Sequence, residues 1–398
     1  MRIGVVSDSP ALTTGYGIVT DQCCRALLAA GHEVRCFGFK DVADNPSRQT
    51  YACRIDPIDP FERWHPKLRG FVSGGAFDVL WVYMDIYNLK EVMSALDGAS
   101  LPPLSVYAIF DGLPAYRRLL ALLRRFRTVM VTMDPAAELL QMEGIDVHLV
   151  VPPGVDLKLF QRLDRHTLRR EAAMQDAFVV GAFGRNTERK QQPRLLLALQ
   201  RLVRSGDMSD LLLYFHCARR GYWDLEDLAE RWGVRAQVVF ADDLTDETLG
   251  VPVRGHQPGE AARWPRIPPS FGYVERLNLC DMVVNVPHGG DFEQILVEAP
   301  ACGVPVAGTD DEGIMRVALG PGMPLKAGEF TIGNAGQLLH YVAIDAIEQV
   351  IRTWKTDARE RRVVAEAGHA WAAHHDWGPL RRAVVSSVVF AARGEIRQ

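Results

Sequence analysis

A loop near the middle of the chain carries the side chains best suited to binding phosphate. The stretch GAFGRNTERK follows a short apolar run and contains Arg185, Arg189 and Lys190. A guanidinium group grips two oxygens at once and an ammonium group supplies a point charge, so these residues suit a diphosphate. A solvated basic loop is the alternative interpretation.

A glycine loop near the start of the chain is a second candidate for contact with an anion. In TTGYGIVTD, Gly15 and Gly17 flank Tyr16 just before a predicted helix. Glycines at such a position let backbone N–H groups approach an anion at the N-terminus of the helix. The spacing differs from the dinucleotide fingerprint G-x-G-x-x-G, because Thr20 stands three positions after Gly17. An ordinary turn is the alternative.

Carboxylates gather in a third stretch, PHGGDFEQILVEAPACGVPVAG. A helix is predicted to start near Phe292, which would place Asp291 and Glu298 on one face, two turns apart, with the backbone N–H groups of 292–294 exposed to a cleft. Carboxylates on an apolar helix are costly to bury without partners, and the hydroxyl groups of a sugar or ribose are suitable partners. Capping and a buried ion pair are the alternatives. Pro300 predicts a kink or a short helix.

Acids also follow the predicted strands of the first half of the chain. There they could bind an acceptor hydroxyl or act in proton transfer, and a turn or helix cap is the alternative for each. These acids are Asp8, Asp85, Asp111 and Asp134.

The elements that must position these residues alternate between short apolar runs and helical stretches in both halves. This alternation predicts two doubly wound α/β domains, each with a parallel sheet covered on both faces. The predicted domains are 1–160 and 172–370, with a helix in 371–398 packing back on the first domain. The long connection over 244–271, rich in Pro, Gly and charge, is predicted to be a functional loop or an insertion.

Length and composition fit this arrangement. A chain of 398 residues is expected to form about two domains, and 48% hydrophobic with 24% charged residues is typical of a globular protein. The net charge of -4 gives no general attraction to nucleic acid or anionic membranes. Seven cysteines without C-x-x-C spacing predict neither a disulfide framework nor a zinc site, and a cytoplasmic location is expected. The chain opens on a strand, and no apolar run approaches the roughly 20 residues of a membrane span, so neither secretion nor membrane insertion is expected.

Taken in order, these stretches resemble the GT-B glycosyltransferases, specifically the retaining nucleotide-sugar enzymes of glycosyltransferase family 4 (glycosyl transferases group 1). The resemblance covers most of the chain and rests on four segments: TGYG followed by LLAAGHEV, VPPGVDLKLF, GRNTERK and EAPACGVPVAGT. It implies the GT-B fold, in which two Rossmann-like domains face each other across a cleft. The first domain would hold the acceptor and the second the nucleotide-sugar donor.

The resemblance also implies roles for residues. Arg185 and Lys190 would hold the donor diphosphate and stabilise the leaving nucleoside diphosphate, and Glu298 would accept hydrogen bonds from the ribose. The remaining donor-binding positions would be Gly15, Tyr16, Gly17, Gly184, Phe292, Glu293 and Gln294. Scaffold positions near the base and ribose would be Val304, Pro305 and Thr309.

The chain departs from the family at its acidic motif, a Glu followed by Gly-Phe-Gly, with a second Glu eight positions after the first. Counting back from Glu298 reaches Gly290. Asp291 is predicted to take the role of the first acid, because Phe292 then nearly matches, and Glu293 replaces a glycine. The predicted catalytic set is therefore Arg185, Lys190, Asp291 and Glu298.

The family's histidine after a strand of the first domain has no evident counterpart. The comparable stretch DVLWVYMD offers Asp85. Asp85 and Asp111 are therefore the predicted acceptor-side residues.

The resemblance thus implies a retaining glycosyltransferase that uses no metal and no cofactor, with a nucleoside diphosphate sugar as donor substrate. The hydroxyl acceptor stays open among a glycan, a lipid, a metabolite, a protein and a modified DNA base, and the oligomeric state is not predicted. Two alternatives remain on the same fold: a nucleotide-sugar or glycan-binding partner subunit with weak or no catalysis, and a nucleotide-sugar epimerase.

Overall fold

The chain forms two units in the computed structural model, which describes residues 1–41, 51–59, 63–206, 208–241, 267–268 and 270–394. The N-terminal unit comprises Met1–Gly154, Ile332–Leu338 and Trp377–Gln398, and the C-terminal unit comprises Val155–Thr331 and Leu339–Asp376. The predicted insertion over 244–271 lies outside the described residues, except for 267–268 and 270–271.

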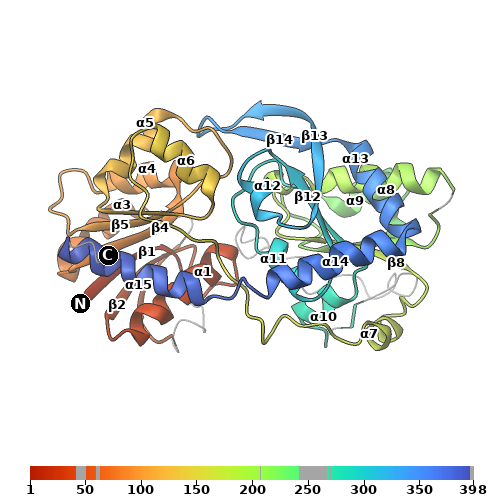
Figure 1. Cartoon of the computed structure of the whole chain (residues 1–398), viewed down its shortest axis with the longest axis horizontal. Coiled ribbons are helices and arrows are strands. Elements are labelled where there is room, and N and C mark those ends of the chain that lie inside the picture. Colours follow the sequence, from red (N-terminus) through yellow and green to blue (C-terminus); the bar gives the residue numbers. More distant parts are fainter. Residues whose placement is uncertain (42–50, 60–62, 207, 242–266, 269, 395–398) are drawn as a thin grey trace. The chain divides into compact units, whose positions relative to one another are not determined.

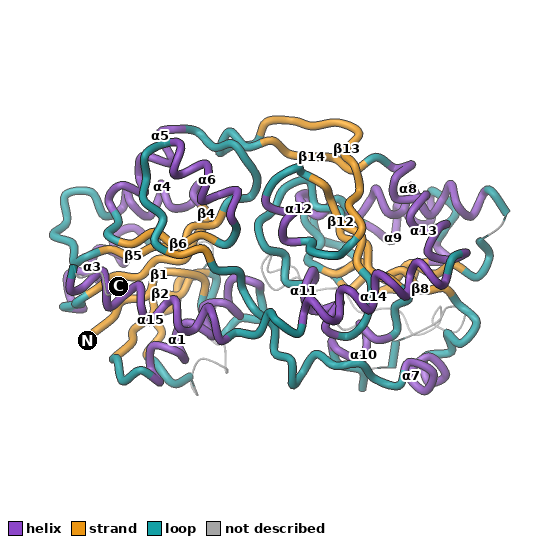
Figure 2. Tube along the Cα trace, in the orientation of Figure 1, coloured by secondary structure: helices purple, strands orange, loops and turns teal. Residues whose placement is uncertain are grey.

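The N-terminal unit is built on a seven-stranded sheet of order β3-β2-β1-β4-β5-β6-β7. Figure 2 shows β1, β2, β4, β5 and β6 of this sheet. All of its neighbouring strands pair in parallel. The strands are β1 (Arg2–Asp8), β2 (Glu33–Phe39), β3 (Arg54–Ile58), β4 (Val79–Asp85), β5 (Leu104–Ile109), β6 (Thr128–Val131) and β7 (Leu149–Val150).

Helices cover both faces of this sheet. Figure 1 shows α4 and α6 on one side of it and α1 and α15 on the other. Leu27 of α1, Trp81 of β4 and Leu380 of α15 belong to one buried apolar cluster, which explains why the last helix of the chain is part of this unit. The helical elements are α1 (Gly15–Ala29), α3 (His65–Gly75), α4 (Ile86–Ala95), α5 (Arg117–Leu120), η1 (Ala121–Arg125), α6 (Asp134–Met142) and α15 (Gly378–Arg393).

The C-terminal unit repeats this plan with a sheet of order β10-β9-β8-β11-β12-β13-β14. The pairings from β10 through β13 are parallel. The strands are β8 (Phe178–Phe183), β9 (Leu211–His216), β10 (Val238–Phe240), β11 (Met282–Asn285), β12 (Val306–Asp310), β13 (Met323–Ile332) and β14 (Leu338–Val342).

Amphipathic helices close the core of this second sheet. In α8, Leu195, Leu199 and Leu202 recur at helical spacing and are buried, so one face of the helix packs into the core. Helices α8, α9 and α13 lie side by side (Figure 1). The helical elements are α7 (Arg165–Glu171), η2 (Glu188–Lys190), α8 (Gln192–Arg204), α9 (Leu225–Arg231), η3 (Arg235–Gln237), α10 (Tyr273–Asn278), α11 (Ile295–Ala301), α12 (Ile314–Ala318), α13 (Ile344–Thr356) and α14 (Ala358–Ala372).

The strand orders determine where ligands can be bound. In each sheet the order reverses beside the first strand, between β1 and β4 in the N-terminal unit and between β8 and β11 in the C-terminal unit. Open parallel sheets bind ligands outside the carboxyl ends of their strands at such a switch point. The loops after β8 and β11 therefore form the expected binding region of the C-terminal unit.

No helix in the described parts of the chain combines the length and the apolar character that crossing a membrane requires.

Candidate functional site

The loop after β8 folds its lysine back over its own first residue. Gly184 has a φ of 123°, and a Cβ there would lie 3.1 Å from Cε of Lys190. A larger residue would therefore be strained and would push the lysine away. Glycine at this position lets Lys190 lie across the carboxyl end of β8.

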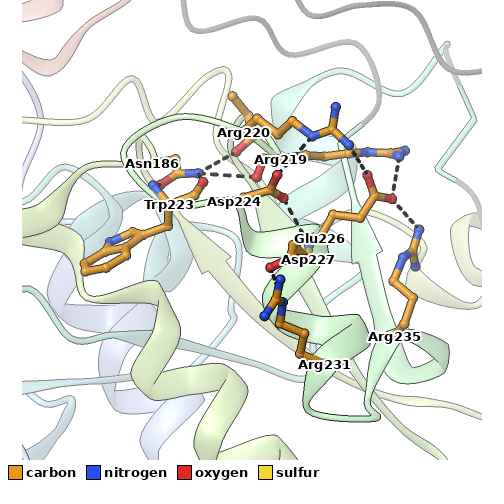
Figure 3. Close-up of polar contacts among 10 residues, drawn as sticks. Asn186, Arg219, Arg220, Trp223, Asp224, Glu226, Asp227, Arg231 and Arg235 are labelled. Atoms are coloured by element: carbon orange, nitrogen blue, oxygen red, sulfur yellow. Dashed lines mark hydrogen bonds and ion pairs between the residues drawn. The ribbon is translucent and has the colours of Figure 1, made fainter.

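Two polar side chains hold the loop on either side of Arg185. The amide of Gln192 donates to the carbonyl of Arg185 at 2.8 Å from the first turn of α8. Asn186 is buried and binds the loop after β9: Nδ2 donates to the carbonyl oxygens of Ala218 (3.1 Å) and Trp223 (2.7 Å), and Oδ1 accepts from the N–H of Trp223 (3.1 Å) (Figure 3). Arg185 itself is exposed.

The loop after β9 is stiffened by a charge network of its own. Figure 3 shows Glu226 between three arginines. Its Oε1 contacts Arg219 at 3.1 Å and Arg235 at 3.2 Å, and its Oε2 lies 3.8 Å from Arg220. Asn186 thus connects the cationic loop after β8 to the loop after β9, which is held in place by these ion pairs.

We expect Asn186→Ala to weaken both folding and ligand binding. The change leaves buried carbonyl and N–H groups of the loop after β9 without their partner, which should lower the free energy of unfolding by about 2 kcal/mol. Because the loop holding Arg185 loses an anchor, nucleoside diphosphate affinity should fall as well. Urea unfolding and titration calorimetry measure the two effects. Gln200→Ala is the control. Gln200 lies on α8, as Gln192 does, and the change removes one side-chain hydrogen bond, to the carbonyl of Trp232.

The structure corrects the predicted start of the helix after β11. Helix α11 begins at Ile295, three residues later than predicted, because Oδ1 of Asp291 accepts from the N–H of Phe292 at 2.7 Å and keeps the backbone outside the helix. Asp291 and Glu298 therefore do not share a helix face, and the N–H of Phe292 is already engaged. The expectation of a short helix at Pro300 is confirmed, since α11 ends at Ala301.

The carboxylate of Glu293 contacts two cations of the loop after β8, Arg189 and Lys190. Arg189 donates from Nη1 to Oε1 of Glu293 and also to the carbonyl of Gly289 at 2.7 Å, while Lys190 donates from Nζ to Oε2 of Glu293. The side chains of Lys190 and Glu293 are each 11% exposed. This contact joins residues from both loops of the switch point.

The same contact sets the charge of the three groups. Burial raises the pKa of Glu293, but the nearby Arg189 and Lys190 outweigh burial and lower this pKa to about 2. Burial lowers the pKa of Lys190, and Glu293 opposes that effect. Glu293 is therefore ionised at neutral pH.

Gly290 leaves room for the ion pair between Glu293 and Arg189. A Cβ at position 290 would lie 2.8 Å from Oε1 of Glu293 and 2.9 Å from Nη1 of Arg189. The Glu293–Arg189 pair thus fills the space that a side chain at position 290 would enter. The two departures from the family motif, Gly290 and Glu293, are physically linked.

Glu298 lies buried on α11 with a tyrosine beside it. The hydroxyl of Tyr273 donates to Oε2 of Glu298 at 2.8 Å. Burial raises the pKa of Glu298 to about 7, although the hydrogen bond from Tyr273 opposes this. The ring of Tyr273 also packs against Phe183 and His216, at the carboxyl ends of β8 and β9. Glu298 is thus positioned at the same edge of the sheet as the cationic loop.

Several buried polar atoms around these loops have no hydrogen-bond partner among the described residues. Such atoms are costly inside a protein and are suited to a polar ligand. They are both amide atoms of Gln294, Nδ1 of His288, Nδ2 of Asn285 and Oε1 of Gln192. The other ring nitrogen of His288 contacts Oε2 of Glu188 at 2.7 Å.

The predicted residues of the N-terminal unit gather around Tyr16. Its ring lies 4.9 Å from that of Tyr83. Burial raises its pKa well above the usual value, and the nearby charges of Asp85, Asp111 and Asp8 raise it further. Asp85 and Asp111 are therefore brought together beside the glycine loop, after β4 and β5.

Local contacts explain part of this group without a ligand. Asp85 caps α4 by accepting from the N–H of Asn88 at 2.8 Å, and Asp8 pairs with Lys40 at 2.9 Å. A Cβ on Gly17 would lie 2.4 Å from the carbonyl oxygen of Leu12, so close backbone approach requires this glycine.

The remaining members of the glycine loop and its neighbours have simpler surroundings. The N–H of Gly17 donates to Oγ1 of Thr14 at 3.1 Å, as a helix cap, whereas a Cβ on Gly15 would meet nothing within 4 Å. Asp134 is the first residue of α6.

The predicted scaffold residues lie behind the C-terminal site. Val304 is buried, Pro305 accepts from the N–H of Val283 at 2.9 Å, and Oγ1 of Thr309 donates to the carbonyl of Pro287 at 2.7 Å. The last bond fixes the start of the loop that leads to Gly290.

Sequence reasoning missed three contacts of this site: Asn186 with the loop after β9, Tyr273 with Glu298, and Glu293 with Lys190. Asn186 stands between Arg185 and Lys190 in the sequence, so its position in the predicted phosphate-binding loop could have indicated a role in the site. Tyr273 gave no signal, because it follows the long connection between β10 and α10. Among the described residues, no group of three or more His, Cys, Asp and Glu side chains is arranged to hold a metal ion.

No protein-family model matches the chain. Over 273 residues, 67% of this chain, the sequence is 26% identical to the D-inositol 3-phosphate glycosyltransferase of Segniliparus rotundus. The chain matches 53% of that protein, about half of its length.

Solved structures match over nearly the whole chain. Anabaena Alr3699/HepE in complex with UDP and glucose has a TM-score of 0.70 at 17% identity, covering 98% of this chain and 99% of the other. Sucrose-phosphate synthase from Thermosynechococcus elongatus has a TM-score of 0.72 at 18% identity, covering 98% and 100%. The trehalose-6-phosphate protein from E. coli bound with UDP-2-fluoro glucose has a TM-score of 0.63 at 13% identity, covering 98% and 99%.

These matches confirm the predicted fold class. The chain has the GT-B fold, with two Rossmann-like domains, and part of its sequence is similar to that of a glycosyltransferase.

Proposed function

We propose that this chain is a glycosyltransferase that moves a sugar from a nucleoside diphosphate sugar to a hydroxyl group, with retention and without a metal. Two similar proteins support the donor class, since HepE was crystallised with UDP and glucose and the E. coli protein with UDP-2-fluoro glucose. The similarity to D-inositol 3-phosphate glycosyltransferase supports sugar transfer as the reaction.

One observation carries the proposal: cations on the loop after β8 lie beside the start of α11, which bears Glu298. Lys190 and Arg189 are linked through Glu293 to the segment that opens this helix. The field of Arg185 also lowers the pKa of Lys190, after the larger effects of burial and Arg189, so Arg185 lies near. A diphosphate bound by these cations would put its ribose toward the carboxylate of Glu298.

In the proposed reaction the bond between the anomeric carbon and the β-phosphate oxygen breaks, and its electron pair stays on the phosphate. The acceptor oxygen forms the new bond to the anomeric carbon and gives its proton to the leaving phosphate. Arg185 and Lys190 stabilise the negative charge that develops on that phosphate. Because arginine and lysine supply this charge, the proposed reaction needs no metal ion.

On the acceptor side we assign Asp85 and Asp111 as candidates. Both raise the pKa of Tyr16, and both lie at the carboxyl edge of the N-terminal sheet, Asp85 as the last residue of β4 and Asp111 after β5. Their carboxylates could orient an incoming hydroxyl group by accepting its hydrogen bond. The acceptor is proposed only as a hydroxyl compound.

A partner subunit that binds nucleotide sugars without turnover is the second candidate function. The observation in its favour is Glu293, because its carboxylate occupies the cations that the diphosphate needs.

Product analysis separates the candidates. Purified protein is incubated with single nucleotide sugars, alone and with hydroxyl acceptors, and the products are identified by mass spectrometry and NMR with and without EDTA. A glycosylated product with the donor's anomeric configuration, lost in Arg185→Ala and kept in EDTA, is expected. Binding without turnover would favour the partner subunit, and an altered donor sugar without acceptor would indicate an epimerase.

A further inference from the structure

Glu293 is a fixed negative charge inside the proposed diphosphate site. Its two oxygens are each taken by a cation, Oε1 by Arg189 and Oε2 by Lys190. Its side chain is 11% exposed and its pKa is lowered to about 2 by the two cations, which overcome the effect of burial. The carboxylate therefore stays ionised over the whole range in which an enzyme is assayed.

The space around Glu293 leaves it little freedom to move aside. A Cβ on Gly290 would lie 2.8 Å from Oε1 of Glu293, so the carboxylate lies close to the backbone of Gly290. The backbone carbonyl of Glu293 accepts from the N–H of Leu296 at 2.9 Å in the first turn of α11. A diphosphate that binds Lys190 must therefore bind beside Glu293.

The nucleotide-sugar donor and the nucleoside diphosphate product differ in how strongly the carboxylate of Glu293 repels them. The diphosphate of a nucleotide sugar is esterified at both ends and carries two negative charges. The nucleoside diphosphate left after transfer has a terminal phosphate whose second pKa is about 6, so it carries close to three at neutral pH. Coulomb repulsion from one fixed carboxylate grows in proportion to the charge of the ligand.

We propose that Glu293 is a specificity-determining residue of the donor site, whose carboxylate weakens binding of the nucleoside diphosphate product more than binding of the nucleotide-sugar donor. This inference rests on the proposed function. Its consequence is faster product release, a step that often limits turnover in enzymes. Glu293 is thus a working part of the site, and its place next to Lys190 and Arg189 is compatible with catalysis.

Other charged groups near Glu293 also affect the binding of donor and product, which share the nucleoside and the diphosphate. Arg185 and Glu188 are on the loop after β8, His288, the partner of Glu188, and Asp291 are on the segment after β11, and Glu298 is on α11. The ratio of the two affinities isolates the effect of the extra phosphate charge, because donor and product share the nucleoside and the diphosphate.

The test is titration calorimetry of Glu293→Gln and the wild type with a nucleoside diphosphate and the matching nucleotide sugar. The variant should bind the diphosphate more tightly relative to the nucleotide sugar by about tenfold, the effect of a unit charge roughly 6 Å away at an effective dielectric constant of about 40. Glu348→Gln is the control. Glu348, on α13, pairs with Arg201 of α8 at 3.1 Å, so the change removes a carboxylate from an ion pair. Arg201 is about 14 Å along α8 from Gln192, the residue at the site end of this helix.

An unchanged or reversed ratio in Glu293→Gln, or an equal change in Glu348→Gln, would overturn the inference. Absence of binding by every nucleoside diphosphate to the wild type would instead overturn the proposed function.

A second variant keeps the inference testable if Glu293→Gln does not fold. Glu293→Ala also removes the carboxylate and leaves Arg189 and Lys190 in place. Its affinity for the nucleoside diphosphate relative to the nucleotide sugar should rise in the same direction, and an unchanged ratio would contradict the inference.

Discussion

Replacing Lys190 with Ala is expected to lower kcat/KM for the nucleotide sugar by about 100-fold or more, the usual effect of removing a group that stabilises developing charge. The ammonium group lies at the carboxyl end of β8, where a Cβ on Gly184 would be 3.2 Å from its Nζ. Glu293 keeps Arg189 as a partner after the change, so the fold should be retained. Steady-state kinetics of donor consumption measure the effect.

Lys355→Ala is the matched control for this experiment. Lys355 pairs with Asp210 at 2.8 Å, and its side chain is 18% exposed, so it is a largely buried lysine in an ion pair like Lys190. Asp210 precedes β9, at the opposite end of the sheet from the site. Equal loss in the two variants, or a folded Lys190→Ala protein with wild-type kinetics, would refute the assigned role.

The affinity for the nucleotide sugar is expected to rise with pH up to about pH 7 and then level off. Burial raises the pKa of Glu298 to about 7, so in the free protein the carboxyl is protonated below that pH. Ribose hydroxyl groups donate best to the ionised form, and donor binding must therefore displace a proton. Below pH 7 the affinity should fall by up to about tenfold per pH unit.

Glu298→Gln removes the carboxyl group that titrates near pH 7, and it therefore tests whether Glu298 causes the pH dependence of donor affinity. The variant should bind the donor at least about tenfold more weakly at pH 8, as expected when a hydrogen bond to a charged group is lost, and its affinity should be nearly flat with pH. Calorimetry with a nucleotide sugar is suitable because its diphosphate does not titrate in this range. A wild-type slope that persists in Glu298→Gln would assign the titration to another group.

The same pKa predicts how this residue affects folding. The folded state holds the proton of Glu298 more tightly than the unfolded state does, because its pKa is about 7 instead of 4.5. The contribution of Glu298 to stability therefore decreases as pH rises from about 4.5 to about 7 and is constant above that range.

The fold class could be predicted because its signals are local. The run FVVGAF is apolar throughout and MVVN is apolar up to its last residue, as expected for strands buried on both faces, and α8 carries its leucines at helical spacing. Arg185 and Lys190 could be chosen by residue type and by their place after a strand.

The contacts that define the site could not be predicted in the same way. Lys190 and Glu293 are 103 residues apart, and Tyr273 and Glu298 come from different helices, so only the folded sheet brings each pair together. The start of α11 was misplaced because the side chain of Asp291 binds the next N–H, a local competition that helical periodicity does not reveal.

The most direct test of a donor site in the C-terminal unit is a thermal-shift screen of nucleoside diphosphates with the wild type and Lys190→Ala. Specific binding stabilises the folded state in proportion to the logarithm of ligand excess over Kd, so a ligand at about 100 times its Kd should raise Tm by several degrees. We predict that at least one nucleoside diphosphate does so for the wild type and that the shift is largely lost in Lys190→Ala. No shift with any nucleoside diphosphate, or an equal shift in the variant, would contradict the donor site described above.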